Sequence, residues 1–108
     1  MNEQEVEDEL QRLGKNAPRL SPDKIDAAIG MAEYHVFSNK TTVCCLTLRN
    51  GFTVIGMSAC VDPANFVQGI GEDVAFRNAR NQVWQLESYL LHQREWLKVV
   101  GYLKGTKV

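Results

Sequence analysis

The dipeptide Asn50-Gly51 constrains the fold of this chain more than any other local feature. It lies between two segments rich in β-branched, aliphatic and aromatic residues, 41–49 and 52–60. A two-residue turn of type I′ needs positive φ at both central positions, and asparagine and glycine both tolerate it. The sequence therefore predicts an antiparallel β-hairpin centred on this dipeptide.

The expected turn also fixes a register, in which Arg49 pairs with Phe52 and Leu46 pairs with Ile55. Side chains alternate between the two faces of a strand, so the register assigns each residue to a face. One face is wholly apolar and carries Cys44, Leu46, Leu48, Ile55, Met57 and Ala59. The other is mixed and carries Val43, Cys45, Thr47, Phe52, Val54 and Ser58. We expect the apolar face to pack against helices. A lone two-stranded ribbon is marginally stable in water, so we also expect the second face or an edge of the ribbon to make a further contact.

A long helix is predicted from about residue 71 onward. Glu72 and Asp73 stand in its first turn, where the helix dipole favours acidic side chains. Its apolar residues recur at intervals of three and four, at Phe76, Ala79, Val83, Leu86 and Leu90. This stripe predicts a helix lying across the apolar face of the hairpin. Gly69 and Gly71 are expected to break any earlier helical turn.

The first 20 residues are interpreted as a helix followed by a connector. Asn2 is placed to form a capping box with Glu5, and Gly14 is suited to end the helix. Its apolar stripe is thin and consists of Val6, Leu10 and Leu13. A stripe this narrow makes the helix dependent on docking for its stability.

A second helix is predicted over residues 22–32, with Ser21 as its cap and Pro22 at its first position. Its expected buried face is formed by Ile25, Ala28, Ile29 and Ala32. Residues 35–37 are a candidate third strand. The predicted class is thus α+β, with two N-terminal helices, a central antiparallel hairpin and one long C-terminal helix packed on the sheet.

Length and charge narrow the range of partners. The 108 residues suit a single domain, whose last segment, residues 98–108, is expected to fray. The net charge of −1 favours neither nucleic acid nor a membrane as a partner. The charge is uneven, however, since residues 1–33 carry eight acids and four bases and the remainder five acids and eight bases. The acidic N-terminal helix is therefore either drawn onto a basic surface, in the same chain or a neighbour, or simply solvated.

Cysteine usage points to a reducing compartment. The three cysteines, Cys44, Cys45 and Cys60, are an odd number and argue against a closed disulfide framework. The N-terminus is acidic and lacks the basic-then-apolar pattern of a secretory leader, and no apolar run approaches the length of a membrane span. We expect a cytoplasmic protein with no membrane partner.

Four residues on one side of the long helix form the main candidate binding surface. Arg77, Arg80, Asn81 and Trp84 recur at helical spacing, offset from the apolar stripe, and Arg49 of the hairpin is a fifth candidate for the same basic patch. Arginine and asparagine beside an indole suit an anion, a nucleotide or an acidic partner. Tryptophan and arginine are also enriched in binding hot spots. The alternative is that Trp84 flanks the core beside a solvated, ion-paired face.

Catalytic, metal and cofactor sites are weakly supported. Cys60 precedes the helix start at Asp62-Pro63 and is a candidate nucleophile, but no spacing places His35 or His92 beside it. The cysteines and histidines lack the CxxC and HxxxH spacings of metal sites. Gly69-Ile70-Gly71 lacks the third glycine and the lysine of phosphate-binding loops. We therefore predict no catalytic residue, metal or cofactor.

Several motifs occur together in a specific order. They are LTLRNGFTVIG at residues 46–56, SACVDPANF at 58–66, ARN at 79–81 and WQLESYLL at 84–91. With Ser21-Pro22 upstream, these motifs resemble a small tailed-phage family named after gene product forty-nine of one phage and gene product sixty-six of another. The resemblance covers roughly residues 17–91. It implies a phage or prophage origin and expression inside a bacterium, and it carries no catalytic activity with it.

These observations lead to one expected function and two alternatives. We expect a non-enzymatic phage accessory protein that acts by binding a partner, and that forms a homodimer or small oligomer in the cytoplasm of its bacterial host. The first alternative is an inhibitor of host defence, which acts on a host protein or sequesters a signalling nucleotide. The second is a cysteine-dependent enzyme.

Overall fold

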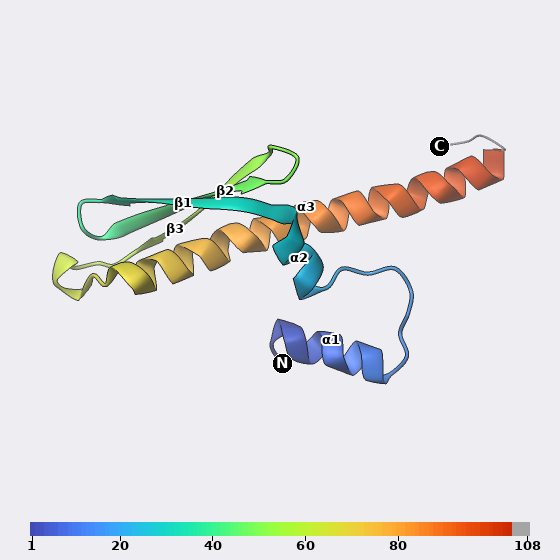
Figure 1. The fold of residues 1–108 in the computed structure, drawn as a ribbon, viewed down its shortest axis with the longest axis horizontal. Helices are drawn as coiled ribbons and strands as arrows, with labels where there is room; N and C mark the ends of the chain where they lie inside the picture. The colour runs from blue at the N-terminus through green and yellow to red at the C-terminus, as the bar shows by residue number, and fades with distance from the viewer. Residues whose placement is uncertain (105–108) are drawn as a thin grey trace.

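The computed structural model describes residues 1–104, with side chains as far as residue 101. In chain order the elements are α1 (Glu3–Arg12), α2 (Pro22–Ala28), β1 (Ile29–Phe37), β2 (Thr41–Leu48), β3 (Thr53–Ala59), the 3-10 turn η1 (Pro63–Asn65) and α3 (Gln68–Lys104). The strands form one antiparallel sheet in the order β1-β2-β3, and α3 lies along one face of it (Figure 1). The predicted α+β class is confirmed, and residues 35–37 belong to a full third strand.

The hairpin around Asn50 closes with a three-residue loop. Leu48 N–H donates to the Phe52 carbonyl oxygen at 2.8 Å, and Gly51 has a φ of +90°. The Asn50 side chain accepts a hydrogen bond from Phe52 N–H, and Asn50 itself keeps a negative φ. This pattern is that of a tight turn followed by a glycine bulge. The pair of positive φ angles expected here occurs at Ser38-Asn39, in the turn between β1 and β2.

The expected register is wrong by one residue, because the loop holds three residues and not two. Leu46 pairs with Val54 and not with Ile55. A slip of one residue moves every side chain of a strand to the opposite face. The face toward α3 carries Thr42, Cys44, Leu46 and Leu48 from β2 with Val54, Gly56 and Ser58 from β3. The outer face therefore carries Ile55, Met57 and Ala59, which we expected inside.

The second helix is shorter than expected. It ends at Ala28, and β1 begins at the next residue. Ile25 is fully buried and Ile29 packs against the core as predicted, but Ala32 lies exposed on β1. Pairing with β2 gives the backbone of alternate residues in Ile29–Phe37 hydrogen-bond partners, and this tertiary contact outweighs the helical spacing of the apolar residues.

The long helix begins earlier than expected. It starts at Gln68 and passes through Gly69 and Gly71, where we expected a break. Packing explains the second glycine, because a Cβ at Gly71 would lie 2.6 Å from the Thr42 hydroxyl oxygen. Gly71 therefore marks a close approach between α3 and β2, and its conformational freedom does not end the helix.

Small residues bring α3 against β3. A Cβ on Gly56 would come within 2.8 Å of Ala79 Cα and closer still to Ala79 N and Ala75 O. The core around this contact consists of Ile25, Cys44, Leu46, Leu48, Val54, Ala75, Ala79 and Val83. Phe76 and Leu86 pack at its margin. The predicted stripe is thus confirmed as far as Leu86, whereas Leu90 lies exposed.

Beyond Leu86, α3 continues past the end of the sheet to Lys104 (Figure 1). We call residues 87–104 the bare half of α3. Its exposed large apolar side chains are Tyr89, Leu90, Trp96 and Val99. The tail expected to fray from residue 98 is helical as far as Lys104, and residues 105–108 lie outside the described residues. Over the part of the chain that the structure covers, no helix is both long enough and apolar enough to cross a membrane.

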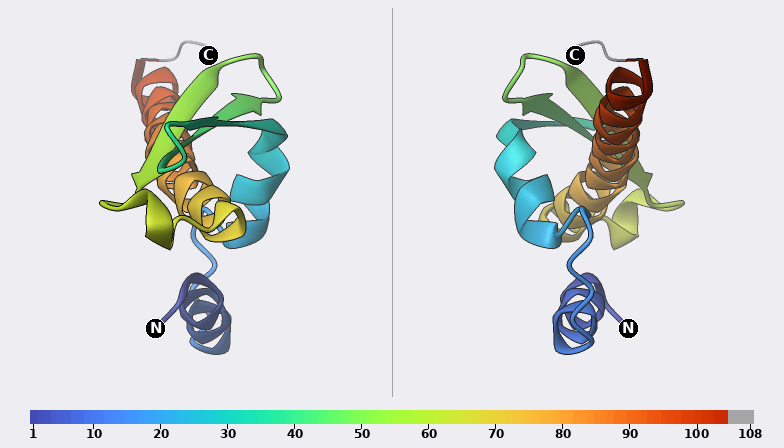
Figure 2. Two further views of the ribbon diagram at one scale, coloured as in Figure 1. Left: turned by 90° about the vertical axis from the view of Figure 1, so that its left-hand side faces the viewer. Right: turned by 90° about the vertical axis from the view of Figure 1, so that its right-hand side faces the viewer.

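The N-terminal helix stands apart from the rest of the molecule. Its capping box between Asn2 and Glu5 is confirmed, and Gly14 follows its end with a φ of +69°. Val6 and Leu13 are exposed, so most of the thin apolar stripe is not buried. Figure 2 shows α1 below the sheet and α3, joined to α2 by the connector. Apolar packing therefore contributes little to its attachment.

Candidate functional site

The structure brings three of the five candidate residues together. Arg77, Arg80 and Asn81 line an open hollow of about 460 Å³ on α3, together with Glu3 of α1. Trp84 does not line this hollow and packs against the core, which agrees with the alternative that it flanks the apolar interior. The candidate surface is therefore smaller and more polar than the sequence pattern suggested.

Arg80 is occupied by contacts within the chain. Its Nη1 lies 2.5 Å from Glu3 Oε2, and its Nε lies 2.9 Å from Asp26 Oδ1. Its side chain is only 14% exposed, and hydrogen bonding to Glu3 raises the pKa of its guanidinium above the ordinary value. Arg80 therefore clamps α1 and α2 onto α3. Of the two alternatives for the acidic N-terminal helix, attraction to a basic group applies to Glu3, and the basic group belongs to this same chain.

The rest of the hollow is exposed but not strongly basic. Arg77 is 65% exposed and pairs with Asp73, one turn away, at 2.8 Å. Asn81 is exposed beside it. The two arginines are thus matched by three nearby carboxylates, those of Glu3, Asp26 and Asp73. This balance gives a phosphate or another anion little net attraction.

Arg49 lies at a different place from the hollow. Its backbone N–H donates to the Ala28 carbonyl oxygen at 2.9 Å, and its side chain donates to the Ala27 carbonyl oxygen. Both acceptors belong to the last turn of α2, where carbonyl groups lack helical partners. Arg49 therefore caps α2 and joins it to the hairpin loop.

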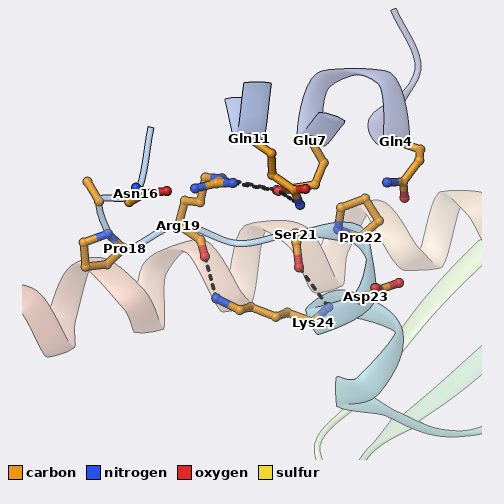
Figure 3. Close-up of a pocket in the computed structure, with 11 residues that line it drawn as sticks. Gln4, Glu7, Gln11, Asn16, Pro18, Arg19, Ser21, Pro22, Asp23 and Lys24 are labelled. Carbon is orange, nitrogen blue, oxygen red and sulfur yellow. Dashed lines mark hydrogen bonds and ion pairs between the residues drawn. The ribbon is translucent and has the colours of Figure 1, made fainter. Parts of the chain in front are cut away.

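A second hollow, of about 320 Å³, lies between α1, the connector and the start of α2. Figure 3 shows its polar lining. Arg19 Nη2 lies 2.6 Å from Glu7 Oε2, and Lys24 Nζ donates to the Arg19 carbonyl oxygen at 2.9 Å (Figure 3). Hydrogen bonding to Arg19 lowers the pKa of the Glu7 carboxyl below its ordinary value. This ion pair is the second attachment of α1, and the sequence did not single it out.

Cys60 lines a small hollow of about 150 Å³ at the start of α3, with Ser58 and Phe66 among its neighbours. The residues that line it include no histidine. His35 lies on the outer face of the sheet, where its ring packs edge-to-face on Phe37 with centroids 4.4 Å apart. Among the described residues, no histidine is thus positioned in this hollow to activate the thiol.

The outer face of the sheet is the largest surface that the sequence interpretation placed incorrectly. Ile55 and Met57 of β3 are more than half exposed there, as are Met31 and Phe37 of β1. Cys45 lies between them on β2 and is partly buried. Glu33 and His35 lie between Met31 and Phe37 on the same face, so the apolar side chains there are interspersed with polar ones. Exposed apolar side chains grouped in this way are typical of a contact site.

The bare half of α3 has one uncharged side and one charged side. At 3.6 residues per turn, Tyr89, Leu90, Trp96 and Leu97 fall on one side of the helix. The opposite side carries the ion pair of Lys98 with Glu95, at 3.1 Å. This segment is therefore amphipathic although no other described element covers its apolar side.

Comparison with known protein families gives a match to most of the chain. The model of a family described as phage protein (N4 Gp49/phage Sf6 gene 66) matches residues 20–95. The match spans α2, the whole sheet and α3 into its bare half, and it leaves α1 outside. Comparisons with curated proteins and with solved structures find no match.

Proposed function

The chain belongs to the phage protein (N4 Gp49/phage Sf6 gene 66) family, and we propose that it is a non-enzymatic accessory protein that acts by binding a partner in the cytoplasm of the host. One observation supports this proposal above the others. In the part of the chain that the structure describes, a single copy leaves two groups of large apolar side chains exposed, one on the outer face of the sheet and one on the uncharged side of the bare half of α3. Surfaces of this kind are covered in a working protein by another copy or by a partner.

Self-association is the first part of the proposal. A chain of 108 residues buries a modest core, and further burial between copies would add to its stability. Sedimentation of the purified protein from low to high micromolar concentration tests this part. We expect the mass to rise from one chain of 12.2 kDa toward a dimer or small oligomer. A single chain at every concentration would refute it.

A host protein is the proposed partner, and the bare half of α3 is its proposed site. Aromatic and aliphatic side chains there, such as Leu90 and Trp96, suit a protein surface, whereas nucleic acid requires basic groups. The test is capture from host lysate by the tagged wild type and by two variants. Leu90→Glu should lose the captured protein, and Lys98→Glu, on the charged side of the same helix, should retain it. Equal capture by both variants would place the partner elsewhere.

Inhibition of host defence is the second candidate, and phage membership is the observation that favours it. Sequestration of a signalling nucleotide would need a cationic site, but Arg80 is already paired with Glu3 and Asp26. The geometry therefore favours a protein target over a nucleotide. A thermal-shift screen with cyclic and linear nucleotides separates the two versions, since only a bound nucleotide raises the melting temperature.

A further inference from the structure

The two edges of the sheet are not equivalent. On β3, the side chain of Asn78 donates to the Met57 carbonyl oxygen at 2.8 Å, and that of Gln82 donates to the Ile55 carbonyl oxygen. These contacts from α3 occupy acceptors that an added strand would need. At the other edge, β1 has no neighbouring strand beyond it in the described residues. The sheet is therefore open to strand addition on the side of β1.

The ladder shows which backbone groups of β1 face outward. Leu48 of β2 donates to β3, so the alternate β2 residues 41, 43, 45 and 47 bond to β1. Their partners on β1 are residues 37, 35, 33 and 31. The N–H and C=O groups of Ala32, Tyr34 and Val36 therefore point away from the sheet. Within residues 1–104, these three residues offer unpaired backbone donors and acceptors along one line.

We infer that β1 pairs antiparallel with β1 of a second copy, about a two-fold axis at Tyr34. This inference rests on the self-association proposed above and names its surface. In this register Tyr34 faces its own counterpart and Ala32 faces Val36 of the partner subunit, and both are hydrogen-bonded pairs. Two strands of nine residues thereby join two three-stranded sheets into one of six strands.

Side chains on the outer face of β1 are complementary in this register. Glu33 faces His35 of the partner subunit, and Met31 faces Phe37 of the partner subunit, each twice because of the symmetry. These are non-hydrogen-bonded pairs, whose side chains approach most closely. The carboxylate of Glu33 therefore faces an imidazole, and the thioether of Met31 faces an aromatic ring. Glu33 and His35 are both exposed in the single copy, so neither has to leave a buried position.

Neighbouring registers lack this complementarity. An axis at Glu33 places that carboxylate opposite its own copy, and like charges directly opposite destabilise a strand pair. An axis at His35 places Glu33 opposite Phe37 of the partner subunit. Only the axis at Tyr34 matches both charge and apolar character, so the side chains specify one register.

Amide hydrogen exchange tests the pairing directly. As the protein concentration rises through the dimerisation range, exchange should slow at least tenfold at Ala32, Tyr34 and Val36. The amides of Glu33 and His35 bond within the sheet and should stay protected at every concentration. A doubling of mass without slower exchange at residues 32, 34 and 36 would overturn this inference and leave the proposed self-association standing. A single chain at all concentrations would refute both.

A charge swap supplies an independent test. Glu33→Lys and His35→Glu should each weaken the dimer by roughly tenfold, since each variant loses two attractive pairs. The double variant E33K/H35E restores opposite charges and should recover most of the affinity. Thr53→Lys, on the outer face of β3 at the far edge, is the matched control and should leave the dimer unchanged. Equal dissociation constants for all four variants would refute the register.

Discussion

The long helix and the N-terminal helix are attached to the molecule by different physical means. α3 meets the sheet through apolar and small side chains, with Gly56 lying directly against the helix backbone at Ala75 and Ala79. α1 is held by two ion pairs, Glu3 with Arg80 and Glu7 with Arg19, while much of its own apolar stripe is exposed. Burial of apolar surface is insensitive to moderate salt and pH, whereas partly exposed ion pairs respond to both.

This contrast divides the molecule into a stable body and an arm that opens locally. Parts of a protein with few buried apolar contacts open with lower free energy than its core. The body comprises the sheet, α2 and most of α3, and the arm is α1, which is tied to Arg80 of α3 and to Arg19 of the connector. Four measurements test whether the body and the arm are stabilised separately, and they are given in order of decreasing expected effect.

Gly56→Ala should abolish the stable fold of the body. The added methyl group meets backbone atoms of α3 that have no free rotation, so the helix must move off the sheet. We expect a loss of about 3 kcal/mol or more in the free energy of unfolding, measured by urea denaturation. Gly69→Ala is the control, because a Cβ there meets nothing within 4 Å and the residue lies in the first turn of α3. That control should change the free energy of unfolding by less than about 1 kcal/mol.

Arg80→Met should release the arm and leave the body folded. The variant removes both ion pairs that join α1 and α2 to α3, and the partly exposed partners Glu3 and Asp26 regain water. A loss of about 1–2 kcal/mol is expected. Limited proteolysis should then cut within residues 13–21 much faster than in the wild type. Arg77→Met breaks only an exposed pair with Asp73 and should change stability by less than about 0.5 kcal/mol.

Thr42→Val should stabilise the body. The Thr42 side chain is fully buried, and its hydroxyl oxygen has no hydrogen-bond partner within the described residues. Replacing a buried, unpaired hydroxyl with a methyl group of similar size removes a desolvation cost and keeps the shape. Urea denaturation should show a gain of about 1 kcal/mol. A loss of stability would mean that the hydroxyl is hydrogen-bonded in solution.

Acid should loosen the arm before the body. The folded pKa of Glu7 lies below its ordinary value of 4.5, so its ion pair with Arg19 contributes fully above that pH. The contribution is lost as the pH falls through the lowered folded value. Amide exchange in α1, followed from pH 6 to pH 3 after correction for intrinsic rates, should accelerate relative to exchange in β2. Glu7→Gln should remove most of this pH dependence.

Local sequence signals predicted the helix caps, the α3 stripe and the general architecture. The side chains of β3 were assigned to the wrong face, because Asn50-Gly51 fits both a two-residue and a three-residue loop. The strand registers that follow from these two loops differ by one residue. The position of Gly56 in the sequence indicates which face of β3 packs against α3. A glycine inside a strand often marks a close backbone approach, so its face is the one that meets α3. Val54 and Ser58 share that face.

The candidate site was less predictable than the fold. Helical spacing correctly grouped Arg77, Arg80 and Asn81, but it could not show what the guanidinium of Arg80 contacts. Its partner Glu3 is 77 positions away in the sequence, and no periodicity links the two. Pairings between such distant residues depend on the tertiary arrangement of α1 and α3. The same holds for the cap that Arg49 forms on α2.

The distance along the chain between Glu3 and Arg80 has a consequence for how the protein is made. Each strand of the sheet pairs with the strand next to it in sequence, so the sheet can form quickly once its last residues are available. α1 leaves the ribosome before the sheet and α3, and its anchor Arg80 follows 77 residues after Glu3. At about 5–20 residues per second, that delay amounts to roughly 4–15 s. The acidic helix therefore stays undocked at least until Arg80 has been made, and we expect its closure onto Arg80 to follow formation of the sheet.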